Sequence, residues 1–132
     1  MTIVADASVV VAALMDSGPD GTWADELLHS DHLGAPHLMP AEVANLLRRA
    51  VLAGKISDDA ASLGHADLLA LRVELFPYEP FAERVWNLRA NVTAYDAWYV
   101  ALAETLGARL ATLDTRLTRA KGPRCVFTIP PG

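Results

Sequence analysis

Hydrophobic and polar positions divide this chain into short apolar runs and longer stretches with helical spacing. The runs Ile3–Ala5 and Arg109–Leu113 predict central strands of a parallel sheet, because such strands are covered on both faces. Shorter apolar segments predict three further strands, at Leu33–Pro36, Glu74–Tyr78 and Cys125–Ile129.

The segments between these strands predict helices with recognisable start and stop signals. The sequence Gly18 to Gly21 predicts a break between the first two helices. The predicted helices cover Ser8–Met15, Thr22–His29, Pro40–Ala53, Ser57–Arg72, a segment beginning at Pro80, a segment from Thr93 to Gly107, and a short turn from Thr115 to Ala120. Strands that alternate with helices predict one α/β domain over residues 1–132.

Composition narrows the class of protein. Hydrophobic residues make up 52% of the chain and charged residues 20%, which predicts a globular domain rather than a disordered one. The single cysteine, Cys125, excludes a disulfide framework and fits a reducing compartment. No signal peptide or membrane-spanning run is predicted, so we expect a cytoplasmic protein. The net charge of −5 argues against broad, non-specific nucleic-acid binding.

Four acidic residues occupy positions that parallel α/β folds use for ligands. Asp6 and Asp114 follow the two most apolar strands, and Glu42 and Asp96 lie in the first turns of predicted helices. Ligands bind beyond the carboxyl ends of such strands. Carboxylates gathered there cannot all stay ionised alone, and bound Mg²⁺ resolves the conflict. Each acid also has an ordinary structural role open to it, as a helix cap or as a partner of the helix dipole.

Other site chemistries fit the sequence poorly. The four histidines lack zinc-site spacing, and no glycine-rich nucleotide loop is present. Ser8 lacks the surroundings of a nucleophilic serine, so we interpret it as a cap or as a donor to the acidic site. Cys125 is expected to be a small buried hydrophobe. Trp86, Trp98 and Tyr99 are expected in the core more than on a base-stacking surface.

Four motifs along the chain resemble the PIN-domain ribonucleases, and among them the VapC-type toxins of bacterial toxin–antitoxin pairs. The motifs are Asp6-Ala7-Ser8 followed by Leu14, then Glu42 to Arg49 with Gly54 to Ser57, then Thr93 to Ala103, and finally Leu110 to Leu117. Their order and spacing match over essentially the whole chain. The resemblance implies a PIN-like, three-layer α/β/α domain with a central parallel sheet flanked by helices.

The resemblance also implies a catalytic, metal-binding site made of four acids. We expect Asp6, Glu42 and Asp96 to be the main ligands or to orient the ligands, and Asp114 to hold a second ion or a coordinated water. The implied metal is Mg²⁺, with Mn²⁺ as a substitute, and the implied reaction is hydrolysis of RNA phosphodiester bonds. The expected supporting residues are Ser8 and Thr112, and the expected contacts to the RNA backbone are Arg116, Arg119 and Lys121.

Partners follow from the same resemblance. It implies an RNA substrate, a homodimer, no membrane association and a cognate VapB-like antitoxin that lies in an apolar groove. The first helix has an apolar face that could form a wall of this groove or could simply belong to the core. The residues of this face are Val10, Val11, Leu14 and Met15.

Two other classes of protein compete with this interpretation. The first is a non-catalytic binding or regulatory module, such as an inactive PIN-like RNA-binding scaffold. A phospho-receiver domain would belong to this class, but the sequence lacks the adjacent acid pair near the first strand and a lysine after the last strand. The second is a haloacid-dehalogenase-like phosphatase, whose opening requires an acid where Ser8 stands.

Overall fold

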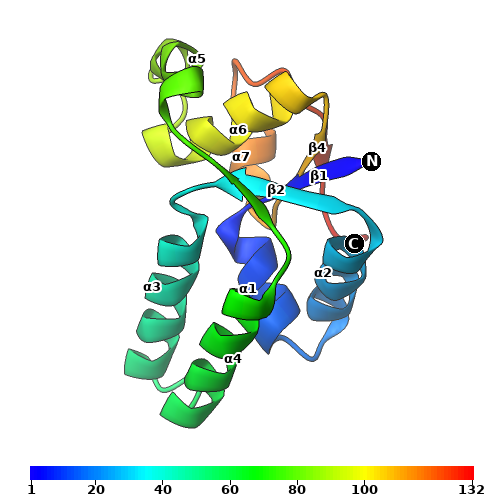
Figure 1. Ribbon diagram of the computed structural model, residues 1–132, viewed down its shortest axis with the longest axis vertical. Coiled ribbons are helices and arrows are strands. Elements are labelled where there is room, and N and C mark those ends of the chain that lie inside the picture. Colours follow the sequence, from blue (N-terminus) through cyan, green and yellow to red (C-terminus); the bar gives the residue numbers. More distant parts are fainter.

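A five-stranded parallel sheet forms the middle layer of the computed structural model, which describes residues 1–132 (Figure 1). The spatial order is β3-β2-β1-β4-β5, and every neighbouring pair runs parallel. The strands are β1 (Thr2–Ala5), β2 (His32–Pro36), β3 (Glu74–Phe76), β4 (Arg109–Ala111) and β5 (Phe127–Thr128). All five predicted strands are confirmed in place, and three of them are shorter than predicted.

Strand β1 is the centre of the sheet and of the core. Ile3, Val4 and Ala5 are at most 1% exposed, as expected for a strand covered on both faces. Val4 lies opposite Gly34 of β2 on one side and Leu110 of β4 on the other. Because β2 and β3 extend the sheet in one direction from β1 and β4 and β5 in the other, the topological switch point lies between β1 and β4.

Helices cover both faces of the sheet, which confirms the predicted three-layer arrangement. Figure 1 shows α5 and α6 on one side and α1 to α4 on the other. In agreement, α1 contacts α2, α3 and α4, and α6 contacts β1, β2 and β4. The helices are α1 (Ala7–Met15), α2 (Pro19–Ser30), α3 (Met39–Leu52), α4 (Asp58–Ala70), the 3-10 helix η1 (Glu79–Phe81), α5 (Ala82–Asn87), α6 (Ala94–Leu106) and α7 (Thr115–Thr118).

The start of α2 corrects a sequence-based prediction. The segment expected as a break is the first turn of this helix, which begins at Pro19. Proline suits that position because its missing N–H has no helical partner there. Gly21 is required for a close approach, since a Cβ at this position would lie 1.7 Å from the carbonyl oxygen of Asp16. The turn between α1 and α2 is therefore set by packing rather than by a flexible loop.

The two ends of α6 match the prediction. The helix is capped by Thr93, whose Oγ1 accepts a hydrogen bond of 3.2 Å from the Asp96 backbone N–H. It ends at Gly107, whose φ of 61° is the left-handed conformation that glycine adopts without strain. These caps fix which residues of α6 face the sheet and which face its carboxyl edge.

The predicted aromatic core is confirmed in one case and wrong in another. Tyr99 is 2% exposed, whereas Trp86 is 64% exposed and lies under the Arg89 guanidinium, 4.3 Å from the ring centroid. The short helix α5 has only one face against the core, and Trp86 lies on the other. Trp98 is half-buried and makes an edge contact with Tyr78, with ring centroids 5.3 Å apart.

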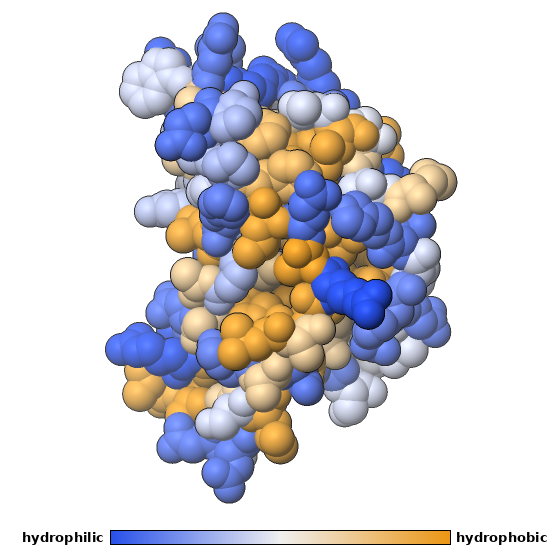
Figure 2. Space-filling view, viewed as in Figure 1, coloured by the Kyte–Doolittle hydropathy of each residue, from blue (hydrophilic) through white to orange (hydrophobic).

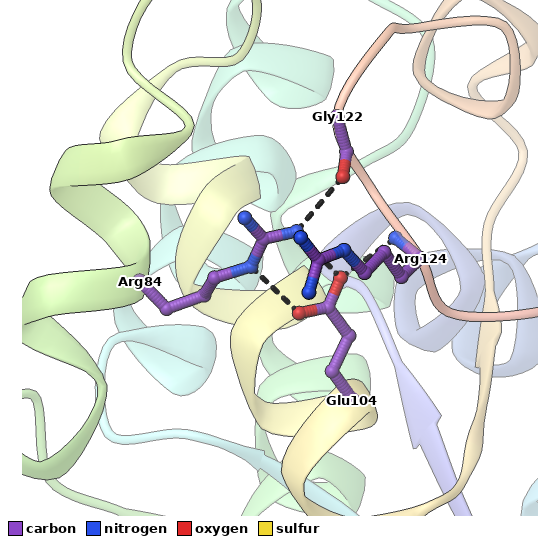
Figure 3. A network of polar contacts seen from close by, with 4 residues as sticks. All are labelled: Arg84, Glu104, Gly122 and Arg124. Atoms are coloured by element: carbon purple, nitrogen blue, oxygen red, sulfur yellow. Dashed lines mark hydrogen bonds and ion pairs between the residues drawn. The ribbon is translucent and has the colours of Figure 1, made fainter.

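A polar network joins α5 and α6 to the C-terminal segment (Figure 3). Arg84 donates to Glu104 from Nε at 2.7 Å and from Nη2 at 3.0 Å, and Nη2 also donates to the Gly122 carbonyl at 2.8 Å. The Arg124 backbone N–H donates to the same carboxylate at 2.7 Å. Cys125, next in the chain, is only half-buried, which corrects the expectation of full burial. Burial still raises the pKa of its thiol to about 11.

Exposed hydrophobic side chains occur on α3 and α4, at Leu52, Leu63 and Leu69. Figure 2 shows hydrophobic side chains on the lower part of this face, where these helices lie, interrupted by hydrophilic ones. A groove of about 410 Å³ runs here and is lined by Ala44, Leu47, Arg48, Val51, Leu52, Asp58, Ala61, Ser62 and His65. None of the helices combines the length and the hydrophobicity needed to cross a membrane.

Candidate active site

The four predicted acids come from four elements that meet at the carboxyl edge of the sheet. Asp6 caps α1 directly after β1, and its backbone N–H donates to the Ala111 carbonyl of β4 at 3.0 Å. Asp114 caps α7 shortly after β4. Glu42 and Asp96 lie in the first turns of α3 and α6. The site therefore lies at the switch point between β1 and β4, where open parallel sheets bind ligands.

The carboxylates are close enough to influence each other's protonation. Burial raises the pKa of Asp96, and the charges of Asp6 and Asp114 raise it further. Burial also raises the pKa of Glu42, and the charges of Asp96 and Asp6 add to the effect. The structure thus brings all four acids into one electrostatic cluster, in which the charge of Asp96 interacts with the charge of each of the other three.

This cluster has no cationic partner within the protein. The four ion pairs of the structure involve other acids: Asp25, Asp31, Glu74 and Glu104. No three side chains of the cluster are placed so that they could hold a metal ion by themselves. Oxygen-only donors with excess negative charge fit a hard divalent cation that keeps part of its water shell, as Mg²⁺ does.

Asp6 is the most constrained of the four acids. It is 7% exposed, and burial raises its pKa although several hydrogen bonds act in the opposite direction. Ser8 Oγ donates to Asp6 Oδ1 at 2.5 Å, Val9 N–H donates to the same oxygen at 3.2 Å, and Thr112 Oγ1 donates to Oδ2. Both predicted supporting residues, Ser8 and Thr112, therefore hold this carboxylate.

The two hydroxyl groups also fasten the segment that follows β4. Ser8 Oγ accepts a hydrogen bond of 3.2 Å from Leu113 N–H, and Thr112 Oγ1 accepts one of 2.9 Å from Asp114 N–H. These side-chain acceptors replace strand partners, so β4 ends at Ala111 and not at the predicted Leu113. The early end of the strand turns Asp114 toward the cluster.

A groove of about 240 Å³ opens beside Asp96 and Asp114. Of the three predicted RNA contacts, only Arg116 lines this groove, while Arg119 and Lys121 lie on exposed surface outside it. The lining residues are Asn91, Val92, Thr93, Asp96, Asp114, Arg116, Leu117 and Ala120. The backbone N–H of Arg116 also donates to Asp114 Oδ1 at 2.9 Å, which links the groove to the cluster.

Sequence reasoning placed Tyr99 in the core and missed its polar contact. Its hydroxyl donates to Glu42 Oε1 at 2.7 Å. Burial, followed by the negative charge of Glu42, raises the pKa of Tyr99 far above that of a free phenol, so the hydroxyl keeps its proton. One signal was available, because Tyr99 lies three residues after Asp96 and such residues share a helix face.

The predicted groove wall on α1 is mainly core. Val10 is fully buried, and Val11, Leu14 and Met15 are partly buried against the core cluster. Only Leu14 of this set lines an open groove, which lies between α1, α2 and α4. Three other helices pack on α1, which explains why so little of its apolar face remains accessible.

The sequence and the fold of this chain match known proteins along nearly the whole length. Residues 3–123 match the PIN domain family. Ribonuclease VapC1 of Mycobacterium tuberculosis is 44% identical over 123 residues, 92% of each chain. The crystal structure of VapBC-5, a member of the VapBC family of toxin-antitoxin systems from Mycobacterium tuberculosis, aligns with a TM-score of 0.61 at 25% identity, covering 98% of this chain and 97% of that one. VapBC2 from Rickettsia felis has a TM-score of 0.70 at 14% identity, covering 99% and 100%, which shows a shared fold. The chain therefore belongs to the PIN domain family, and its relatives within it are VapC proteins.

Proposed function

We propose that this protein is a metal-dependent endoribonuclease and the toxin of a VapBC-like toxin–antitoxin pair. The observation that carries the proposal is the cluster of four carboxylates without a cationic partner, at the switch point of a PIN-domain sheet. The name of the 44% identical relative, Ribonuclease VapC1, supports RNA as the substrate. The chain retains all four acids.

The carboxylates are assigned to divalent-metal binding, with Mg²⁺ as the expected ion and Mn²⁺ as a substitute. Asp6, Glu42 and Asp96 are proposed as the main ligands or as groups that orient the ligands, and Asp114 is proposed to hold a second ion or a coordinated water. A bound ion would lower the pKa of its water to give a nucleophile, and would stabilise the charge that develops on the scissile phosphate. Ser8 and Thr112 keep the Asp6 carboxylate in one orientation, as outer partners of metal ligands commonly do.

Cleavage that depends on a divalent ion is the direct test of this function. The purified protein is expected to cut RNA with Mg²⁺ or Mn²⁺ present, to stop when EDTA is added, and to resume when the ion is restored. Gel electrophoresis of a labelled RNA measures all three states. RNA that is bound but never cut at any ion concentration would overturn the proposal in favour of the non-catalytic PIN-like RNA-binding module.

Arg116 is the proposed contact to the RNA backbone, because it alone among the three basic candidates lines the groove beside the acids. We expect Arg116→Ala to weaken RNA binding by roughly fivefold, which corresponds to about 1 kcal/mol, the upper value for an exposed ion pair. The dependence of log affinity on log salt should fall by about 0.7, the value for one lost phosphate contact on a single strand.

Arg119→Ala provides the matched control, since Arg119 is an exposed arginine one turn away that does not line the groove. Fluorescence anisotropy at several salt concentrations measures both variants. If Arg119→Ala lowers affinity and salt dependence as much as Arg116→Ala, RNA binds to the basic residues on this surface in general and not specifically to the groove.

The proposed partners are a VapB-like antitoxin and a second copy of the chain. Structures of VapBC-5 and of VapBC2 describe such toxin–antitoxin pairs for the related proteins. Co-expression with the product of a short adjacent reading frame, followed by co-purification and a growth assay, tests the antitoxin. Light scattering of the purified protein tests the homodimer. Growth arrest that the neighbouring product does not relieve would count against this partnership.

A further inference from the structure

We infer that Tyr99 is a positioning residue for the metal site, which holds the Glu42 carboxylate in the orientation that ligates the ion. The inference rests on the proposed metal-dependent function and adds a residue to it. In this role, Tyr99 itself contacts neither the substrate nor the ion. Its effect passes entirely through the hydrogen bond to Glu42.

Glu42 needs such a partner because it is a long side chain at a partly open position. It lies in the first turn of α3 and is half-buried, and the Tyr99 hydroxyl is the one hydrogen-bond partner of its carboxylate. Asp6, by contrast, is held by three donors. A free glutamate side chain loses rotamer entropy when it is fixed. A hydrogen bond that fixes it before the ion arrives removes part of that cost.

Tyr99 suits this task because its own position is rigid. Tyr99 is only 2% exposed, and it belongs to α6, which packs against the sheet. The hydroxyl reaches Glu42 Oε1 at 2.7 Å and leaves the second oxygen, Oε2, for another partner. Asp96 lies one turn earlier on the same helix. Helix α6 therefore supplies one proposed ligand directly and positions a second one that belongs to α3.

The Tyr99→Phe variant removes one oxygen atom and keeps the buried ring. We expect it to weaken Mn²⁺ binding about 10-fold to 100-fold, the range for outer partners of metal ligands. Titration calorimetry, or electron paramagnetic resonance of free Mn²⁺, measures the affinity without reference to RNA cleavage. Tyr78→Phe is the matched control, because the Tyr78 side chain also carries a hydroxyl but makes no contact with the acids, and its affinity should equal that of the unmodified chain.

A double-mutant cycle with Glu42→Gln separates positioning from general destabilisation. Tyr99→Phe should have little effect on Mn²⁺ affinity once Glu42 is replaced, because its action passes through that carboxylate. A second variant, Glu42→Asp, shortens the side chain away from the hydroxyl and should be equally insensitive to Tyr99→Phe. Thermal melting of each variant confirms that it is folded.

Two results would overturn the inference, and they differ in what else they overturn. If the unmodified protein binds Mn²⁺ but Tyr99→Phe binds it equally well, or loses the same factor with and without Glu42, the positioning role is wrong and the proposed function stands. If the unmodified protein binds no Mn²⁺ at all, the proposed metal-dependent function fails together with the inference.

Discussion

Asp96→Asn is expected to reduce RNA cleavage by about a thousandfold or more and, at the same time, to stabilise the metal-free protein. The loss of activity follows because a metal ion contributes several kcal/mol of transition-state stabilisation, and each 1.36 kcal/mol corresponds to about a tenfold change in rate. Asp96 is the acid through which all members of the cluster are electrostatically connected. The one side-chain hydrogen bond that acts on the Asp96 carboxylate comes from Thr93 and lowers its pKa, and asparagine keeps a side-chain oxygen that can accept this bond.

The gain in stability follows from the direction of the pKa shift. Burial and the charges of Asp6 and Asp114 raise the pKa of Asp96 in the folded protein above its ordinary value of 3.8. A raised pKa means that ionisation disfavours the folded state. The contribution of Asp96 to stability is therefore most favourable below pH 3.8, and it is lost as the pH rises through the raised folded-state pKa. Near pH 7 the asparagine variant lacks this penalty and should melt at a higher temperature.

Three measurements identify this effect. The difference in melting temperature between Asp96→Asn and the unmodified protein should vanish at low pH, where Asp96 is protonated. Added Mg²⁺ should raise the melting temperature of the unmodified protein more than that of the variant, because ligands stabilise the state that binds them. Asp59→Asn, at an exposed first-turn acid of α4, should give no gain. A folded Asp96→Asn variant with full activity would rule out the proposed site.

The parts of the fold that local sequence determines were predictable. Apolar runs placed all five strands, and the caps Ser57 and Thr93 together with Gly107 located helix ends, because propensity and capping act within a few residues. The four acids were also accessible from sequence. Each follows a strand end or a helix start, and a parallel sheet brings its carboxyl ends to one edge.

The errors occurred where distant contacts override local signals. The segment from Gly18 to Gly21 looks like a loop in sequence, yet the carbonyl of Asp16 packs against Gly21 and the first turn of α2 forms there. Strand β4 was predicted two residues too long because Ser8, about a hundred positions earlier, accepts the hydrogen bond of Leu113. Trp86 was expected in the core, but α5 packs on α6 and buries only its other face, at Val85.

Side-chain hydrogen bonds across long stretches of sequence were not predictable from pattern alone. Tyr99 was correctly expected to be buried, but its bond to Glu42 depends on how α3 and α6 meet at the sheet edge. The same holds for the pair of Arg84 and Glu104 from α5 and α6. A sequence can indicate that a helix face is apolar. Which group forms a hydrogen bond with one oxygen atom on that face depends on how the helices pack.

Glu104→Ala is expected to give a large loss of stability, although Glu104 lies outside the acidic cluster. The carboxylate accepts two hydrogen bonds from Arg84 and one from the Arg124 backbone, at 2.7 to 3.0 Å (Figure 3). Bonds to charged groups contribute about 1.5–3 kcal/mol, and removal of one partner leaves the other without compensation. We expect a loss of about 2–3 kcal/mol, or roughly 10 °C in melting temperature for a chain of this size.

The pH dependence of this loss distinguishes the ion pair from simple packing. Burial alone would raise the pKa of Glu104, but the hydrogen bonds and charges of Arg84 and Arg124 outweigh it and lower that pKa below 4.5. The stabilisation is therefore complete above pH 4.5 and is lost as the pH falls through the lower folded-state pKa. Glu104→Gln, which keeps the shape, should match the unmodified protein only in acid. Glu83→Gln, at an exposed acid of α5 without an ion pair, is the control and should melt normally at every pH. If Glu104→Gln also melts normally at neutral pH, the network in Figure 3 does not stabilise the joint between α5, α6 and the C-terminal segment.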